Sequence, residues 1–336
     1  MKQKENGDNG RRTPARRTPP VAEYRRHLPE TPSVGPDTPG STVTLTIRGE
    51  ELPEHLFRRL LGAYLGGADV FVVREAPEVR PATRAVVRSF CRRTAGPAVV
   101  TESPDALRLE VREDVGGTPF GPRLRAMGDR VLEVHRAAVR SWAGLPLGED
   151  SSWERRDDAI DREAWRLQRD AARRISAGQD VTAALGAWTI ARSLERIADH
   201  AIALGELGGR LAALSAGHRS VTSLEQFHAQ AMEHLEGVLA AVEGATANDL
   251  LDTGEALIAS GRALADRLLP AVNDGEMPPA TAAAVARILE SIGRTVAYAQ
   301  DIAQVVLDRS PEATTAPVFP HTGVILTAGP SAVPAR

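Results

Sequence analysis

The feature that most constrains the fold is a helical pattern of apolar residues that begins near residue 121 and ends near residue 309. Apolar residues recur at intervals of three and four in six segments, and glycine, proline or a capping serine separates one segment from the next. The connections are short, so neighbouring helices should pack antiparallel. The expected helices are 124–143, 152–176, 180–207, 223–242, 248–269 (ended near Pro270) and 278–309.

A different pattern precedes the helices. Residues 42–47 alternate between polar and apolar side chains, as strands do, and 69–73, 98–100 and 107–111 also have strand character. Segments 56–65 and 83–93 have helical spacing. This order predicts a small α+β module. The fold class is therefore mainly α, with two tandem three-helix bundles preceded by that module.

The two ends of the chain differ in composition from the rest. Both are rich in proline and poor in large apolar residues, so they cannot bury enough surface to offset chain entropy, and we expect them to be disordered. A Leu-Glu-x-Ile sequence occurs at Leu194 and again at Leu289, which indicates a weak internal duplication. The expected domains are a disordered arm (1–40), the α+β module (41–115), a first three-helix repeat (121–209), a second, degenerate repeat (220–309) and a disordered tail (311–336).

Composition excludes several classes of function. The formal net charge is −3, so no strong field draws the chain to nucleic acid or to a membrane. The single cysteine, Cys91, cannot form an intramolecular disulfide, and no apolar run approaches the roughly 18–20 residues that span a bilayer. We therefore expect a cytoplasmic protein without membrane insertion. The chain has no Gly-x-Ser-x-Gly sequence and no glycine-rich phosphate loop, which favours a protein that is not an enzyme.

Two pairs of acids carry the most specific chemistry. Asp157 and Asp161 lie four residues apart on the second expected helix, and Glu195 and Asp199 have the same spacing on the third. Each pair lies on one helix face about 5–6 Å apart, and the mutual repulsion costs stability unless a cation compensates. If the two faces meet, four carboxylates converge, and such hard oxygen ligands suit a divalent metal or iron.

A structural interpretation of the same acids stays open beside the metal site. Acids at this spacing are common on solvated helix faces, where neighbouring arginines pair with them. The arginines near enough in sequence are Arg155, Arg156, Arg162 and Arg196.

The sequence bears on two further classes of function, a metal oxidoreductase and a DNA-binding regulator. A carboxylate-bridged metal oxidoreductase on a helical bundle needs Glu-x-x-His sequences, and the adjacent pair Asp199-His200 has the wrong spacing. The alternative is a DNA-binding transcriptional regulator that uses the N-terminal region. The arginine pairs within residues 1–40 are consistent with it, but no helix-turn-helix with a basic recognition helix accompanies them.

One segment of the third helix resembles a known family. Residues 191–201, which read ARSLERIADHA, closely resemble the signature of the PhoU family, and the acids at 157–161 look like that family's second-helix acidic motif. The order and lengths of the helices from 121 to 309 resemble two PhoU repeats. The module at 41–115 looks like the one that precedes the repeats in archaeal-type relatives, although the AbrB-like DNA-binding hairpin of those relatives is not found.

The resemblance implies a function and a site. PhoU proteins damp phosphate uptake and take part in intracellular phosphate homeostasis, acting as helical adaptors for the phosphate ABC transporter or a sensor kinase. A homodimer is expected by the same resemblance. Several members bind metals through acid pairs, and the matching residues here are Asp157, Asp161, Glu195 and Asp199. In the second repeat Glu290 matches, but Arg294 and Ala259 replace acids, so one metal site at most is expected.

Overall fold

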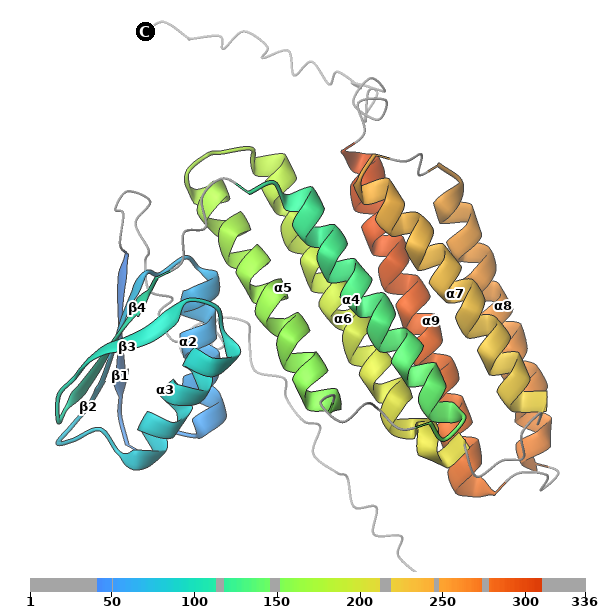
Figure 1. Cartoon of the computed structure of the whole chain (residues 1–336), viewed down its shortest axis with the longest axis horizontal. Helices are drawn as coiled ribbons and strands as arrows, with labels where there is room; N and C mark the ends of the chain where they lie inside the picture. The colour runs from blue at the N-terminus through green and yellow to red at the C-terminus, as the bar shows by residue number, and fades with distance from the viewer. Residues whose placement is uncertain are drawn as a thin grey trace, which may run out of the picture. The chain divides into compact units, whose positions relative to one another are not determined.

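The structure is a computed structural model that describes residues 41–49, 51–112, 118–145, 152–211, 219–244, 248–273 and 278–309. It is mainly helical, with a small four-stranded α+β module before the helical region (Figure 1). The expected fold class is therefore confirmed. The arm (1–40) and the tail (311–336) that the sequence predicts to be disordered lie outside the described residues.

The module alternates strands and helices along the chain. Its elements are β1 (Thr42–Ile47), α2 (Pro53–Leu65), β2 (Val70–Glu75), α3 (Pro81–Arg93), β3 (Pro97–Glu102) and β4 (Ala106–Val111). The strand order is β1-β2-β4-β3, with β1 parallel to β2 and the other neighbours antiparallel. In β1 the residues Val43, Leu45 and Ile47 are buried and alternate with exposed threonines, because successive side chains of a strand point to opposite faces. The buried residues form the module's own core with α2 and α3.

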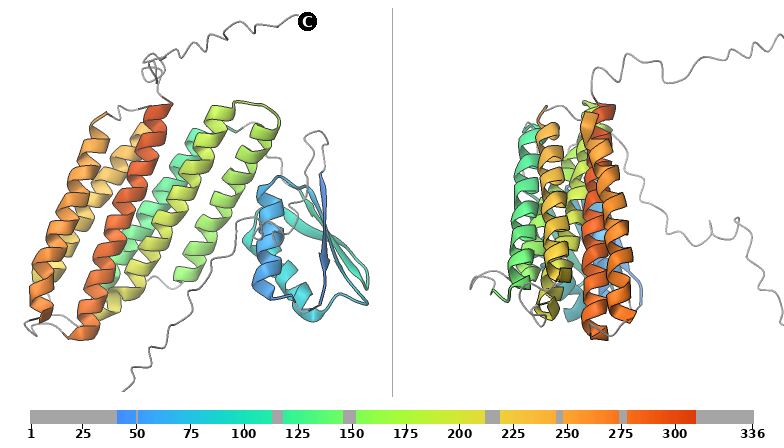
Figure 2. Two further views of the ribbon diagram at one scale, coloured as in Figure 1. Left: turned by 180° about the vertical axis from the view of Figure 1, so that it is seen from behind. Right: turned by 90° about the vertical axis from the view of Figure 1, so that its right-hand side faces the viewer.

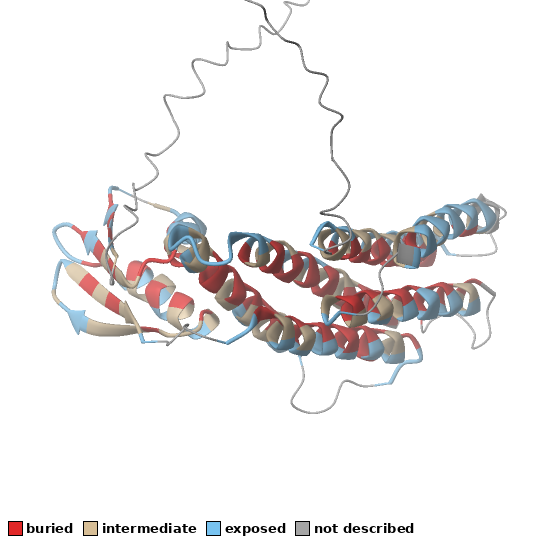
Figure 3. Ribbon diagram, turned by 90° about the horizontal axis from the view of Figure 1, so that it is seen from above, coloured by how far each residue is buried: buried red, intermediate tan, exposed pale blue. Residues whose placement is uncertain are grey.

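Six long helices follow, and they run side by side in the two opposite views of Figures 1 and 2. They are α4 (Phe120–Trp142), α5 (Trp153–Ser176), α6 (Val181–Leu211), α7 (Arg219–Val242), α8 (Asn248–Asn273) and α9 (Pro279–Asp308). The helix α6 packs against α4, α5 and α9, so it connects the first set of three helices to the second. Buried residues follow the inward faces of the helices, as Figure 3 shows in red. No described helix is both long and apolar enough to cross a membrane.

Most ends of the six long helices lie within one or two residues of the predicted bounds, but α4 and α7 begin four residues earlier than predicted and α6 ends four residues later. The hydroxyl of Ser152 accepts a hydrogen bond from the backbone N–H of Arg155 at 3.2 Å, which makes Ser152 the expected N-cap of α5. The expectation that the fifth helix ends near Pro270 is wrong, because α8 continues to Asn273. A proline loses one backbone hydrogen bond within a helix, and this cost is smallest near the helix end.

The two three-helix sets meet through close contacts and a buried pair of histidines. Gly128 of α4 lies directly under Leu239 of α7, where even a Cβ atom would clash. His135 Nδ1 and His228 Nε2 lie 3.1 Å apart, and both rings are buried. Burial lowers the pKa of His135 well below its usual value and lowers the pKa of His228 to about 4. Both rings are therefore neutral near pH 7. The N–H of one ring donates a hydrogen bond to the unprotonated nitrogen of the other.

Arginine side chains of α5 join this helix to the module. Arg169 is fully buried and donates to the carbonyl oxygens of Tyr64 and Ala68 at 2.8 and 2.7 Å and to Asp69 Oδ1 at 2.6 Å. Its guanidinium also lies 4.8 Å from the centre of the Tyr64 ring. Arg173, one turn further on, pairs with the same carboxylate of Asp69. These contacts satisfy the buried charge and fix α5 against the loop between α2 and β2.

Replacing Arg169 with methionine should destabilise the chain by roughly 3 kcal/mol, because two buried carbonyls and a carboxylate lose their donor. Arg173→Met is the matched control. The Arg173 side chain is 41 % exposed, so its loss should cost less than about 1 kcal/mol. Urea unfolding followed by circular dichroism measures both changes in the free energy of unfolding. Equal losses for the two variants would show that the buried guanidinium does not hold the module.

Candidate functional site

The four acids predicted from the sequence lie on two neighbouring helices. Asp157 and Asp161 are on α5, and Glu195 and Asp199 are on α6, which packs along α5. The apolar side chains beside them close the contact between the helices: Ile160 and Ala164 of α5 and Leu194 and Ala198 of α6 are all buried. This packing carries the acids to one face of the helix pair. Asp161 is buried, and the other three are half-buried.

The acids influence one another's pKa values. Loss of water contact, with repulsion from Asp157 and Glu195, raises the pKa of Asp161 from 3.8 to about 7. Loss of water contact, followed by repulsion from Glu195 and Asp157, raises the pKa of Asp199 to about 6. The pKa values of Asp157 and Glu195 are also raised, mainly by burial. The four carboxylates therefore form an acidic face whose negative charge is only partly compensated.

The strongest compensation comes from Arg93, at the end of α3 in the module. Its Nε donates to Asp158 Oδ1 at 2.9 Å, and its Nη2 donates to Asp161 Oδ2 at 3.1 Å. Its guanidinium carbon lies 5.2 Å from the centre of the Phe57 ring and 5.6 Å from that of Trp165. The two rings and two carboxylates fix the guanidinium at the border of the acidic face.

The arginines expected from the sequence contribute less. Arg196 lies 3.6 Å from Glu195 and 3.9 Å from Asp199, and its side chain is exposed to solvent. Arg162 donates instead to the backbone oxygen of Arg92. Arg93 was missed because it is 65 residues from Asp158 in the sequence, and no local spacing links two residues so far apart.

The side-chain type of the four acids suits a metal ion, but their arrangement in space does not. Four carboxylates with raised pKa values are the oxygen donors that hard cations prefer. Among the described residues, however, no three histidine, cysteine, aspartate or glutamate side chains come close enough to hold one ion. Asp161 is bound to Arg93 instead. The arrangement in this structure fits a guanidinium, and a metal ion would need the acids to move.

His200 does not join the acids. Its ring stacks on Tyr298 of α9 with the ring centres 5.9 Å apart, and its Nδ1 lies 3.4 Å from Ser291 Oγ. Burial lowers the pKa of His200, and Arg294 contributes in the same direction. The residues of the second set that match the acid positions, Glu255, Ala259, Glu290 and Arg294, are all exposed.

Comparison with known proteins identifies the helices that carry the acidic face. Residues 124–207 match the family model of the PhoU domain. The chain carries a PhoU domain. The match begins within α4 and ends within α6, so it contains all four acids. No curated protein and no solved structure shows a significant match.

The PhoU domain connects the chain, at the level of the family, with phosphate-related regulation. The family match covers the first set of three helices, and the assignment of α7, α8 and α9 to a second PhoU repeat stays a prediction. The same holds for the archaeal-type origin of the α+β module.

The acidic face of the PhoU domain should make stability fall as pH rises. Asp161 binds its proton more tightly in the folded chain than in the unfolded chain, so the folded state gains stability below about pH 4 and loses it as pH rises to about 7. Asp161→Asn should flatten this fall, by a few kcal/mol at most, because one pKa unit corresponds to about 1.4 kcal/mol.

Urea unfolding between about pH 5 and pH 7.5, in buffer with a chelator, tests this dependence. The control is Asp158→Asn, which removes the other carboxylate bound to Arg93 and leaves Asp161 in place. If the free energy of unfolding of Asp161→Asn depends on pH as steeply as that of the wild type, Asp161 is not the group whose raised pKa causes the dependence.

Proposed function

We propose that this chain regulates phosphate uptake and intracellular phosphate homeostasis as a helical adaptor that damps phosphate transport or signalling and catalyses no reaction. The observation that carries the proposal is the PhoU domain at residues 124–207. The expected partners are a component of the phosphate ABC transporter or a sensor kinase, with the chain acting in the cytoplasm as a homodimer. The DNA-binding alternative rests on residues 1–40, which lie outside the described residues.

The metal dependence expected from the sequence takes a specific form in this proposal. A divalent metal or iron would bind Asp157, Asp161, Glu195 and Asp199 in competition with Arg93, since both cations need the carboxylate of Asp161. Arg93 belongs to the module, whereas the acids belong to the PhoU domain. Competition of this kind would couple cation binding to the contact between α3 and α5. A change in that contact would alter the surface that the chain presents to a partner.

The coupling has a defined electrostatic cost. Release of Arg93 from Asp158 and Asp161 leaves the acidic face with more negative charge, and this cost is offset only when another cation binds there. A ligand shifts such an equilibrium only by the difference in its affinity for the two states. The acids therefore respond to a cation only to the extent that the cation binds more tightly when Arg93 is released.

Phosphate uptake by intact cells tests the proposed function. A strain that lacks this chain should take up phosphate faster than the parent strain when phosphate is abundant, and the wild-type chain should restore the restraint. A variant with all four acids replaced by their amides should fail to restore it if the acidic face transmits the signal. Arg93→Gln should shift the phosphate concentration at which uptake is restrained.

The control for this experiment is Arg88→Gln, which changes an exposed arginine on the same helix as Arg93. It should restore restraint like the wild type. Uptake that is the same with and without the chain would refute the regulatory function itself. Normal restraint by the four-acid variant would refute only the role of the acidic face.

A further inference from the structure

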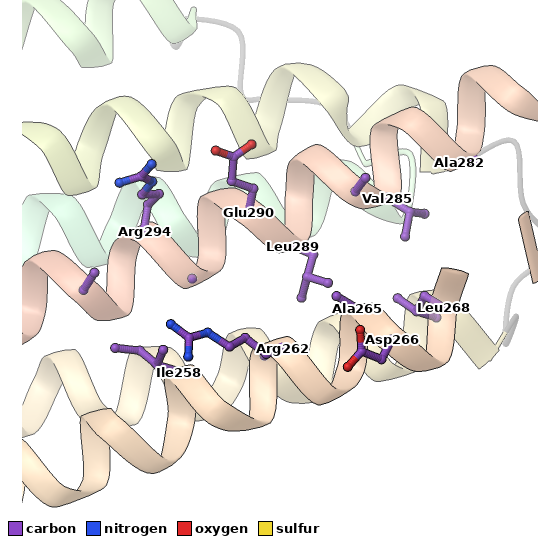
Figure 4. A pocket seen from close by; sticks show the side chains of 14 residues that line it. Ile258, Arg262, Ala265, Asp266, Leu268, Ala282, Val285, Leu289, Glu290 and Arg294 are labelled. Carbon is purple, nitrogen blue, oxygen red and sulfur yellow. The ribbon is translucent and has the colours of Figure 1, made fainter. Parts of the chain in front are cut away.

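A cavity of about 610 Å³ lies between α8 and α9, apart from the acidic face. Its walls are mostly aliphatic, and Ile258, Leu268, Val285 and Leu289 contribute the larger side chains (Figure 4). This volume is within the range of roughly 300–1,000 Å³ that is typical of small-molecule sites. Every residue that lines it belongs to the described part of the chain.

The cavity lies beside the contact between the two helices, where α8 buries Leu264 in the same cluster as Val285 and Ile288 of α9. At the first turns of α8, Gln300 Nε2 donates to Leu251 O at 2.9 Å, and Gly254 allows the Gln300 side chain to lie directly on the helix. Further along, small residues face one another, including Ala265 on α8 and Ala282 and Gly293 on α9. A Cβ atom added to Gly293 would meet no atom within 4 Å, which shows that this position faces open space.

The matching contact in the PhoU domain is closed. The Leu-Glu sequences at Leu194 and Leu289 match α6 with α9, and the match of Asp157 with Glu255 pairs α5 of the PhoU domain with α8. In the contact between α5 and α6, the side chains of Ala164, Leu167 and Ala198 are fully or almost fully buried. The second set places exposed Arg262 and half-buried Gly293 at the positions that correspond to Ala164 and Ala198. At these positions the described second set is thus more open than the first.

The polar side chains of the cavity are unevenly placed. Arg262 extends along the gap between the two helices, whereas Glu290 and Arg294 leave α9 on the side away from α8 (Figure 4). Among the described residues no acid forms an ion pair with Arg262. Asp266 lies one turn further along α8 and is exposed to solvent. The gap therefore combines apolar walls with one cationic group whose charge is not paired.

We propose that this cavity binds a small amphiphilic anion, an aliphatic chain with a carboxylate or phosphate headgroup. The headgroup pairs with Arg262, since guanidinium matches both anions in a bidentate geometry. The aliphatic chain lies against Val285 and Leu289, where its burial supplies the hydrophobic free energy. Among the described residues no aromatic side chain lines the cavity, so its walls offer no surface for stacking a nucleobase, and this favours an aliphatic ligand over a nucleotide.

Isothermal titration calorimetry on the full chain tests the proposal, with dodecanoate, dodecyl phosphate, inorganic phosphate and dodecyltrimethylammonium as probes below their micellar concentrations. At least one of the two dodecyl anions should bind at one site per chain, and the comparison between them identifies the preferred headgroup. Binding of inorganic phosphate as tight as that of dodecyl phosphate would overturn the role of the aliphatic walls. Equal binding of the dodecyl cation would overturn the role of Arg262.

Two variants place the site. Gly293→Leu fills the open space and replaces a poor helix former, so it should stay folded and reduce anion affinity at least tenfold. Arg262→Gln should reduce anion affinity about tenfold and leave binding of the dodecyl cation unchanged. The matched control is Arg287→Gln on the exposed side of α9, which should bind like the wild type. Unchanged affinity in both Gly293→Leu and Arg262→Gln, with helicity intact, would overturn the proposed site.

Discussion

Arginine side chains join α5 to the α+β module, and both the placement of the module and the charge of the acidic face depend on them. Arg169 brings a fully buried charge to the backbone of α2 and its following loop, and Arg93 brings a charge from the module to α5. A buried guanidinium is tolerated when its charge is paired and most of its donors are bonded, so each contact specifies one register between the parts. The apolar stripe of α5 then remains free to pack against α6.

The acidic face and the cavity lie at matched helix pairs of the two three-helix sets, and different side chains at matched positions distinguish them. The PhoU domain keeps paired acids on α5 and α6 and closes the apolar contact beneath them. In the second set, Ala259 and Arg294 stand at positions matched to acids of the first set, and a cavity lies beside the contact between α8 and α9. The positive charge of Arg262 lies where the first set has the methyl group of Ala164. Arg93 supplies the cation at the acidic face, whereas the proposed anion would pair with Arg262 between α8 and α9.

The sequence predicts local features better than distant ones. Period-two alternation located β1 at its exact bounds, and Ser152 marked the start of α5, because both signals depend on neighbouring residues. Pro270 misled the prediction of the end of α8, since a proline in the last turn loses little hydrogen bonding. The spacing of the acids placed each pair on one face of its helix, and α5 and α6 do pack together, but a metal site formed by the four acids stays a prediction. Arg93 and the cavity were not predictable, because they depend on contacts between segments far apart in the sequence.

The central claim is that Arg93 is the cation held by the acidic face in this structure. Titration of the metal-free chain with Mn²⁺ by calorimetry tests it most directly, on wild type, Arg93→Gln, Arg88→Gln and a chain with all four acids replaced by amides. If Arg93 competes for Asp161, then Arg93→Gln should bind Mn²⁺ about tenfold more tightly than wild type and Arg88→Gln, and the four-acid variant should not bind. Equal Mn²⁺ affinity in wild type and Arg93→Gln, with both chains folded, would contradict the account.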